Sequence, residues 1–341
     1  MTLYIIGNGF DIAHHIKCKY SHFGDFLADN YPDYYESIMS GYCRSNALWK
    51  DFENELPSCA THIEEFGSQM GNEMRDELDY DPMDDRGIGR WLDDQYRFLN
   101  ELPKYLRLWV ESIDTKKEAV YKIDRESIFL TFNYTDTLES VYCIDPDNIK
   151  HIHGYVKNKN EELVIGHCNQ KAISYALEKK KEAEVNFVDF AVSTFDRVSK
   201  YCNTTLKRTS NIIDENTEFF NSLSNVDEVI IIGHSLNKVD MPYFEKVLKS
   251  VRENAIWKAY YFEDTDEKPF EKVLDDLGIK KENRFVRKHR SYTYNEKSPV
   301  RNAEFTALPT GQLLCLEIGT FDLAFVFTYN YDDNFYIILF G

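Results

Sequence analysis

Two polar stretches in the middle of the chain carry side chains suited to hydrolytic chemistry. In IFLTFNYTD, Asn133 directly follows an apolar segment, and its amide can donate and accept hydrogen bonds to a sugar hydroxyl or a water. In KHIHGY, His153 precedes a glycine where we expect the chain to bend and leave the imidazole at a rim. Histidine titrates near neutral pH without special tuning, so His153 is a candidate general base. On a strand, His151 and His153 would lie on the same face. The plainer interpretation of His151 is a core histidine that is hydrogen-bonded to the backbone.

Two glycine turns could bring backbone amides against a ligand. In YIIGNGFD, an apolar segment ends at a Gly-Asn-Gly turn, and the next residues could start a helix whose amides and dipole would face a phosphate. The third glycine of the dinucleotide fingerprint is missing, so a tight structural turn is the alternative. VIIIGHSLN repeats the arrangement later in the chain. We predict that both turns and the residues after Asn133 line one ligand site: Gly7, Asn8, Gly9, Phe10, Asp11, Tyr134, Asp136, Gly233, His234, Ser235 and Asn237.

Other interpretations of the same stretches stay open. Asp136 or Thr135 is expected to cap the helix that continues through Tyr142. The sequence GHSLN half matches the nucleophile elbow of serine hydrolases, and its partners are marked by order only: Asp264 and His289. The candidate ligands for a zinc site are His151, His153, His167 and Cys168. They lack the compact spacing of a zinc-binding motif, so we expect no metal.

The elements that must position these residues follow an alternating pattern. Continuous apolar or β-branched segments are typical of central strands covered on both faces: Leu3–Ile6, Ile128–Phe132, Ile149–His153, Leu163–Ile165, Val229–Ile232 and Trp257–Phe262. Helical stripes lie between them, at 244–251 behind Asp240 as an N-cap, at 270–277 before Gly278, and at 188–198. Strands that alternate with helices predict an α/β fold, a Rossmann-like, mostly parallel sheet with helices on both faces.

Two long helical insertions and a tail interrupt this pattern. Residues of about 20–120, with an apolar stripe from Trp91 to Val110 kinked at Pro103, and of about 170–225 are predicted to pack over the ligand edge of the sheet. We therefore predict one domain over 1–300. Residues 301–341 form a small antiparallel β extension of three strands, with NYDDN as a hairpin turn. Its strongly apolar last strand favours burial, and a second copy of the chain in a homo-oligomer is one candidate to cover it.

Composition excludes several classes of protein. The 341 residues are 43% hydrophobic, enough for a core, and the net charge of −18 argues against binding duplex DNA. Seven cysteines without a C-x-x-C pair are typical of reduced thiols in the cytosol. We see neither a signal peptide nor an apolar segment long enough to span a membrane. The sequence thus predicts a soluble, cytoplasmic protein without membrane contact.

Taken together, the motifs resemble those of the AbiH family of bacteriophage abortive-infection proteins. The resemblance rests on LYIIGNGFDIAH with KYSHF after it, then LTFNYTDTLE, HIHG with LVIGH, and IIGHSLNKVD, in order from Leu3 to about Asp240. It implies a role in antiviral defence.

At motif level the same order is similar to sirtuin-like NAD-binding domains of phage-defence proteins. That similarity implies a catalytic asparagine at Asn133, a catalytic histidine at His153, and dinucleotide contacts at Gly7, Asn8, Gly9, Gly233 and Ser235. The implied function is an NAD glycohydrolase, with NAD as substrate or ligand and a phage component or a second defence protein as partner. Two alternatives stay open: a nucleotide-binding sensor without catalysis, and a metal-independent RNase-type toxin that uses His153 and His234.

Overall fold

The computed structural model describes residues 1–42, 47–58, 64–65, 93–94 and 96–289, together with three C-terminal strands. The chain divides into two compact units, Met1–Arg290 and Ser291–Gly341. The second unit holds a sheet in the order β7-β8-β9, with antiparallel neighbours. These strands are β7 (Leu314–Leu316), β8 (Ala324–Tyr329) and β9 (Phe335–Phe340). They confirm the predicted three-stranded tail, whereas the NYDDN turn lies outside the described residues.

A six-stranded, all-parallel sheet organises the first unit. Its strands are β1 (Thr2–Ile6), β2 (Ile128–Thr131), β3 (Ile149–His151), β4 (Glu228–Ile232), β5 (Ile256–Tyr261) and β6 (Arg284–Lys288). They are ordered β3-β2-β1-β4-β5-β6, the order of a doubly wound, Rossmann-like sheet. The chain direction across the sheet therefore reverses between β1 and β4, and the predicted α/β, Rossmann-like fold is confirmed.

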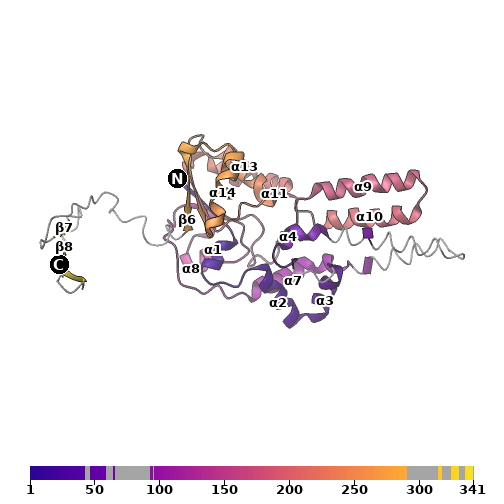
Figure 1. Ribbon diagram of the computed structural model, residues 1–341, viewed down its shortest axis with the longest axis horizontal. Coiled ribbons are helices and arrows are strands. Elements are labelled where there is room, and N and C mark those ends of the chain that lie inside the picture. The colour runs from indigo at the N-terminus through magenta and orange to yellow at the C-terminus, as the bar shows by residue number, and fades with distance from the viewer. Residues whose placement is uncertain are drawn as a thin grey trace. The chain divides into compact units, whose positions relative to one another are not determined.

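Alternate side chains of the strands serve two apolar layers. Leu3 and Ile5 of β1 belong to a cluster with Phe244 and Val247, which lie on helix α13 (Met241–Ser250). Helices α12 (Thr217–Ser222) and α14 (Glu267–Asp276) contribute to the same cluster. On the other face lie α1 (Asn8–Ala13) and α8 (Thr137–Tyr142) (Figure 1). The rings of Phe10 in α1 and Tyr142 in α8 are in contact. The strands are apolar throughout because both faces of the sheet are covered.

Both helical insertions are present in the first unit. The first contains α2 (Tyr20–Asn30), α3 (Pro32–Gly41), α4 (Phe52–Glu55) and α7 (Phe98–Ser112), with Pro103 inside α7. The second contains α9 (Gln170–Val185), α10 (Asp189–Thr204) and α11 (Thr209–Glu215) before α12. Helices α9 and α10 form a hairpin that projects away from the sheet (Figure 1). A second apolar cluster joins α2, α3, α7, α9 and α10, so the insertions share a core of their own. Trp91 lies outside the described residues.

The structure corrects two expectations about strands. Residues 163–165 form no strand. Instead, the Val164 amide donates to the His153 carbonyl, and the Val164 carbonyl accepts from the Tyr134 hydroxyl. The edge strand β6 was not predicted, because charged residues interrupt its apolar positions in RFVRK. An edge strand has a neighbour on one side only, so its sequence lacks the continuous apolar character of the central strands.

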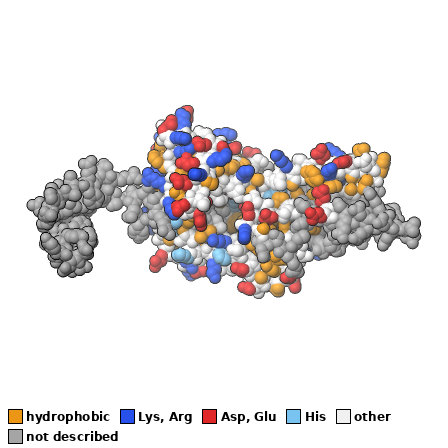
Figure 2. Space-filling model, viewed as in Figure 1, with side chains coloured by type: hydrophobic (Ala, Val, Ile, Leu, Met, Phe, Trp, Pro, Cys, Tyr) orange, Lys and Arg blue, Asp and Glu red, His pale blue; other side chains and the backbone are white. Residues whose placement is uncertain are grey.

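Charged side chains of both signs are interspersed over the face of the molecule that Figure 2 presents. Among the described residues, no helix combines the length and the apolar composition that crossing a membrane would need.

Candidate functional site

A cavity of about 540 Å³ opens where the carboxyl ends of the parallel strands meet. Residues that follow β1, β2, β3, β4 and β5 line it, so five strands deliver side chains to one place. It lies at the carboxyl ends of β1 and β4, where the strand order reverses. Open α/β sheets bind ligands at this position. The first helical insertion closes one side with Tyr20, Glu53 and Trp109.

The structure brings most of the predicted site residues together. The lining includes Gly7, Asn8, Gly9, Asp11, Asn133, Tyr134, His153, Gly233, His234, Ser235 and Asn237. Two predicted residues lie elsewhere. Phe10 is fully buried and stacks on Tyr121, and the carboxylate of Asp136 accepts a hydrogen bond from Thr115 and pairs with Lys157.

Neither residue proposed as the cap of α8 caps it through its side chain. Asp136 occupies the N-cap position, but its side chain makes no capping hydrogen bond because it faces Thr115 and Lys157. The Thr135 hydroxyl donates instead to the Asp11 carboxylate at 2.5 Å. The predicted N-cap position of Asp136 is therefore confirmed, but the expected capping by a side chain is not observed. Thr135 contributes to the cavity wall.

The two glycine turns pack directly against each other. The Gly9 amide donates to the Gly233 carbonyl at 2.7 Å, and the Phe10 amide donates to the Gly7 carbonyl. A Cβ on Gly7 would lie 2.5 Å from the Cα of His234. At Gly233, where φ is +71°, a Cβ would lie 2.1 Å from the Phe10 nitrogen. The glycines thus allow close contact between the turns, and the amides of Gly9 and Phe10 already have partners within the chain.

His153 and His151 occupy different surroundings. His151 ends β3, and its ring nitrogens contact the Asn133 carbonyl and the Glu139 carboxylate, both at 3.0 Å. His153 lies in the turn beyond, against Phe132 and Tyr243, and is only 4% exposed. Gly154 bends the chain as predicted, with φ +91°, but the imidazole lies inside the cavity wall rather than at a rim.

His153 is a neutral imidazole with a free acceptor site. Burial, followed by the nearby charge of Lys207, lowers its pKa from 6.5 to about 3. Its Nε2 is buried without a hydrogen-bond partner, 3.6 Å from the Asp240 carboxylate. A group placed in the cavity could donate a hydrogen bond to this nitrogen. Any proton that the imidazole gained would be stabilised by the neighbouring carboxylate.

Asp240 is the centre of a buried charge network that the sequence did not reveal. Its two carboxylate oxygens face His234 at 3.3 Å and Lys207 at 3.4 Å. Lys207, whose side chain is completely buried, also pairs with Glu53 at 2.8 Å. The network joins the turn after β4 to both helical insertions, because Glu53 comes from the first and Lys207 from the second. Asp240 occupies the predicted N-cap position of α13 but makes no capping bond with its side chain.

Opposing effects set the charges of this network. Burial by itself would raise the pKa of Asp240, but Lys207 and the bond from His234 hold it well below its ordinary value. Burial opposes the charge of Lys207, yet Glu53 and Asp240 outweigh it and raise the Lys207 pKa. The pKa of Glu53 is raised mainly by burial. Asp240 is therefore a fixed carboxylate and Lys207 a fixed cation.

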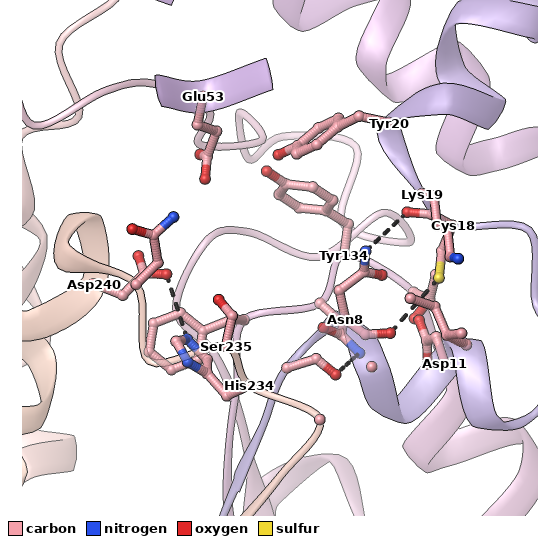
Figure 3. A pocket seen from close by; sticks show the side chains of 18 of the residues that line it. Asn8, Asp11, Cys18, Lys19, Tyr20, Glu53, Tyr134, His234, Ser235 and Asp240 are labelled. Carbon is pink, nitrogen blue, oxygen red and sulfur yellow. Dashed lines mark hydrogen bonds and ion pairs between the residues drawn. The ribbon is translucent and has the colours of Figure 1, made fainter. Parts of the chain in front are cut away.

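The opposite side of the cavity holds another carboxyl group, that of Asp11 (Figure 3). Burial raises the pKa of Asp11 to about 6, despite the hydrogen bond from Thr135. The second carboxylate oxygen, Oδ1, is buried without a partner. Asn133 lies nearby and donates from its amide nitrogen to the Gly7 carbonyl at 3.2 Å. Figure 3 also shows the rings of Tyr20 and Tyr134 side by side between the two acidic sides.

The structure does not gather the residues of the zinc alternative. His151 is engaged as described above, and His167 contacts the Cys202 carbonyl and the Asn169 amide instead. Within the described ranges, no group of three or more His, Cys, Asp or Glu side chains has the arrangement of a metal site. The residues named by order for a serine hydrolase also have other contacts, since Asp264 pairs with Lys288 and His289 stacks on Phe262.

Fold and site together define a Rossmann-like α/β protein with a cavity at the carboxyl edge of its sheet, and several acidic side chains line that cavity. Comparison with protein-family models matches residues 3–261 to the family described as "Bacteriophage abortive infection AbiH". This match covers well over half of the chain, and the protein belongs to the AbiH family. No curated protein matches the chain. Family membership supports a role in abortive infection by bacteriophage. The matched range contains every cavity-lining residue except four that follow β5: Phe262, Glu263, Asp266 and Phe270.

Proposed function

We propose that this protein is a cytoplasmic effector of abortive infection that binds NAD in the cavity and hydrolyses its nicotinamide–ribose bond. The observation that carries the proposal is the convergence of Asn133, His153 and Asp240 on one cavity at the β1–β4 reversal of the sheet. Its trigger is expected to be a phage component or a second defence protein.

The groups at hand suit attack by water on a ribosyl carbon. Cleavage of an N-glycosidic bond builds positive charge on the ribose ring, and a fixed carboxylate such as Asp240 stabilises that charge. Nicotinamide leaves as a neutral molecule, so its departure needs no acid. The attacking water donates one proton to Nε2 of His153, and its oxygen bonds to the ribose. The products are nicotinamide, ADP-ribose and one proton.

The low pKa of His153 makes the imidazole a weak base by itself. The Asp240 carboxylate, 3.6 Å from Nε2, compensates because it stabilises the imidazolium that forms during proton transfer. Asn133 holds the water or the ribose through the acceptor oxygen of its amide, while its nitrogen is fixed on the Gly7 carbonyl. The three residues therefore act as one unit.

The test is to incubate the purified full-length protein with NAD, ATP and total RNA separately and to follow each by chromatography. We expect nicotinamide and ADP-ribose from NAD, with losses of roughly 10²–10⁴-fold in His153→Ala and Asn133→Ala. Asp136→Asn is the matched control, because Asp136 follows the same strand but lies away from the cavity. Binding of NAD without turnover would favour the sensor, and cleavage of RNA alone would favour the RNase-type toxin.

A further inference from the structure

Acidic residues outnumber cationic residues in the cavity lining, which is unfavourable for an anionic ligand. Six acidic residues line it: Asp11, Asp51, Glu53, Asp240, Glu263 and Asp266. The cationic side chains among its described lining residues are Lys19 and Lys50, both exposed. Asp11 and Asp240 are buried, and Glu53 is half-buried. Three of the acidic residues therefore lie inside, and the other three lie toward the solvent with the two lysines.

One buried cation balances this inner charge only in part. Lys207 is shared between Glu53 and Asp240, at 2.8 and 3.4 Å, so its single charge serves two carboxylates. Asp11 receives a hydrogen bond from Thr135 and forms no ion pair with another of the described residues. The inner cavity retains a net negative potential, which the low-dielectric walls strengthen.

Unpartnered atoms indicate that this inner region is built to receive a ligand. Nε2 of His153 and Oδ1 of Asp11 are both buried and lack hydrogen-bond partners. Both residues line the cavity. Buried polar atoms without partners are rare in folded proteins, because each one costs free energy. Both atoms are acceptors when His153 is neutral and Asp11 is ionised, so they match a group that brings hydrogen-bond donors or positive charge.

The expected phosphate site is weaker than the glycine pattern indicates. The amides of Gly9 and Phe10 donate to carbonyls within the chain, and α1 has six residues only. A pyrophosphate would therefore find little help from this turn and would be repelled by the buried carboxylates. Lys19 and Lys50 offer it positive charge at the mouth instead.

We infer that the inner cavity recognises positive charge: it selects a nucleotide with a cationic ring, which lies inside between the carboxylates, while the phosphates remain at the mouth near Lys19 and Lys50. The inference rests on the proposed function and names the form of NAD that the site takes. Oxidised NAD has a cationic nicotinamide ring, whereas the ring of NADH is neutral. The same carboxylates that attract the ring would stabilise the ribosyl cation as the bond breaks.

The test compares binding of NADH with binding of carba-NAD⁺, which keeps the cationic ring but has no hydrolysable ribosyl bond. Calorimetry on the full-length protein should give a dissociation constant at least tenfold lower for carba-NAD⁺. The preference should shrink in Asp240→Asn and in Asp11→Asn. It should persist in Asp264→Asn, because Asp264 is an exposed acid paired with Lys288.

The outcomes separate the inference from the function on which it rests. Equal binding of the two ligands, or tighter binding of NADH, overturns the inference and leaves nucleotide binding intact. A preference that both carboxylate variants retain overturns the assignment to these residues. If Asp240→Asn does not fold, Asp11→Asn decides the matter alone. Failure of both ligands to bind overturns the proposed function itself.

Discussion

His153 should make the protein less stable as the pH falls from 7.5 to 5.0. Burial lowers its pKa from 6.5 to about 3, so the folded state resists the proton that the unfolded chain accepts. The stabilisation is complete above pH 6.5 and is lost progressively as the pH falls toward 3. At pH 5.0 the solution lies 1.5 units below the unfolded pKa. At 1.36 kcal/mol per unit, His153 alone costs about 2 kcal/mol of unfolding free energy.

Urea denaturation of the parent and of His153→Gln at pH 7.5 and 5.0 measures the contribution of His153 to the unfolding free energy. The glutamine side chain is polar but does not titrate, so the variant should lose about 2 kcal/mol less than the parent between pH 7.5 and 5.0. His15→Gln, which changes an exposed histidine, should keep the parental difference. If His153→Gln shows the same pH dependence as the parent, burial does not lower the pKa of His153 and the reasoning from its buried position is wrong.

Three further predictions concern the groups around the cavity. Gly233→Ala should cost more than about 3 kcal/mol or prevent folding, whereas Gly278→Ala, with φ +80° but open space, should cost about 1–2 kcal/mol by thermal melting. Lys207→Met should lower the unfolding free energy, measured by urea denaturation, by about 3–5 kcal/mol because two carboxylates in the network lose their cation. Its control, Lys272→Met in an exposed pair, should change the unfolding free energy by less than about 0.5 kcal/mol. For Asp11, whose pKa is raised to about 6, stability is lost as the pH rises from 3.8 to 6. The unfolding free energy of Asp11→Asn, relative to that of the parent, should therefore rise by about 3 kcal/mol between pH 4 and 7. If variant and parent differ by the same amount at both pH values, the carboxylate is not buried as described.

The central sheet could be predicted from the sequence because its strands are buried on both faces. β1, β2, β4 and β5 are continuous apolar segments, and their ends were placed to within a residue or two. The helices α13 and α14 followed from their apolar stripes, and Gly278 ends α14 with a positive φ as expected. The edge strand β6 could not be read in this way, because pairing on one side leaves little trace in the sequence. Residues 163–165 were predicted as a strand and form a loop, because a short apolar segment does not by itself identify a strand.

The site could be predicted only as far as it is built from strand ends. Asn133, His153 and Ser235 follow strands, and parallel strands bring their carboxyl ends to the same edge. Glu53 and Lys207 were out of reach because they come from helical insertions in which charged residues are common, and nothing in their spacing marks them as buried. The role of Asp240 was missed for a different reason: an aspartate before a helix is fully explained as a cap.

The glycine turns show why a motif can locate a site and still misstate its chemistry. Gly7, Gly9 and Gly233 lie at the cavity, as a phosphate loop would, but their missing side chains make room for each other's backbone. This packing draws β1 and β4 together at the reversal of the sheet and brings Asn133 and His234 to the same cavity. What the cavity then attracts depends on Asp11, Glu53 and Asp240, whose charges no glycine pattern encodes. A nucleotide that binds here must satisfy those carboxylates first, and this requirement favours a cationic ring inside and phosphates at the mouth.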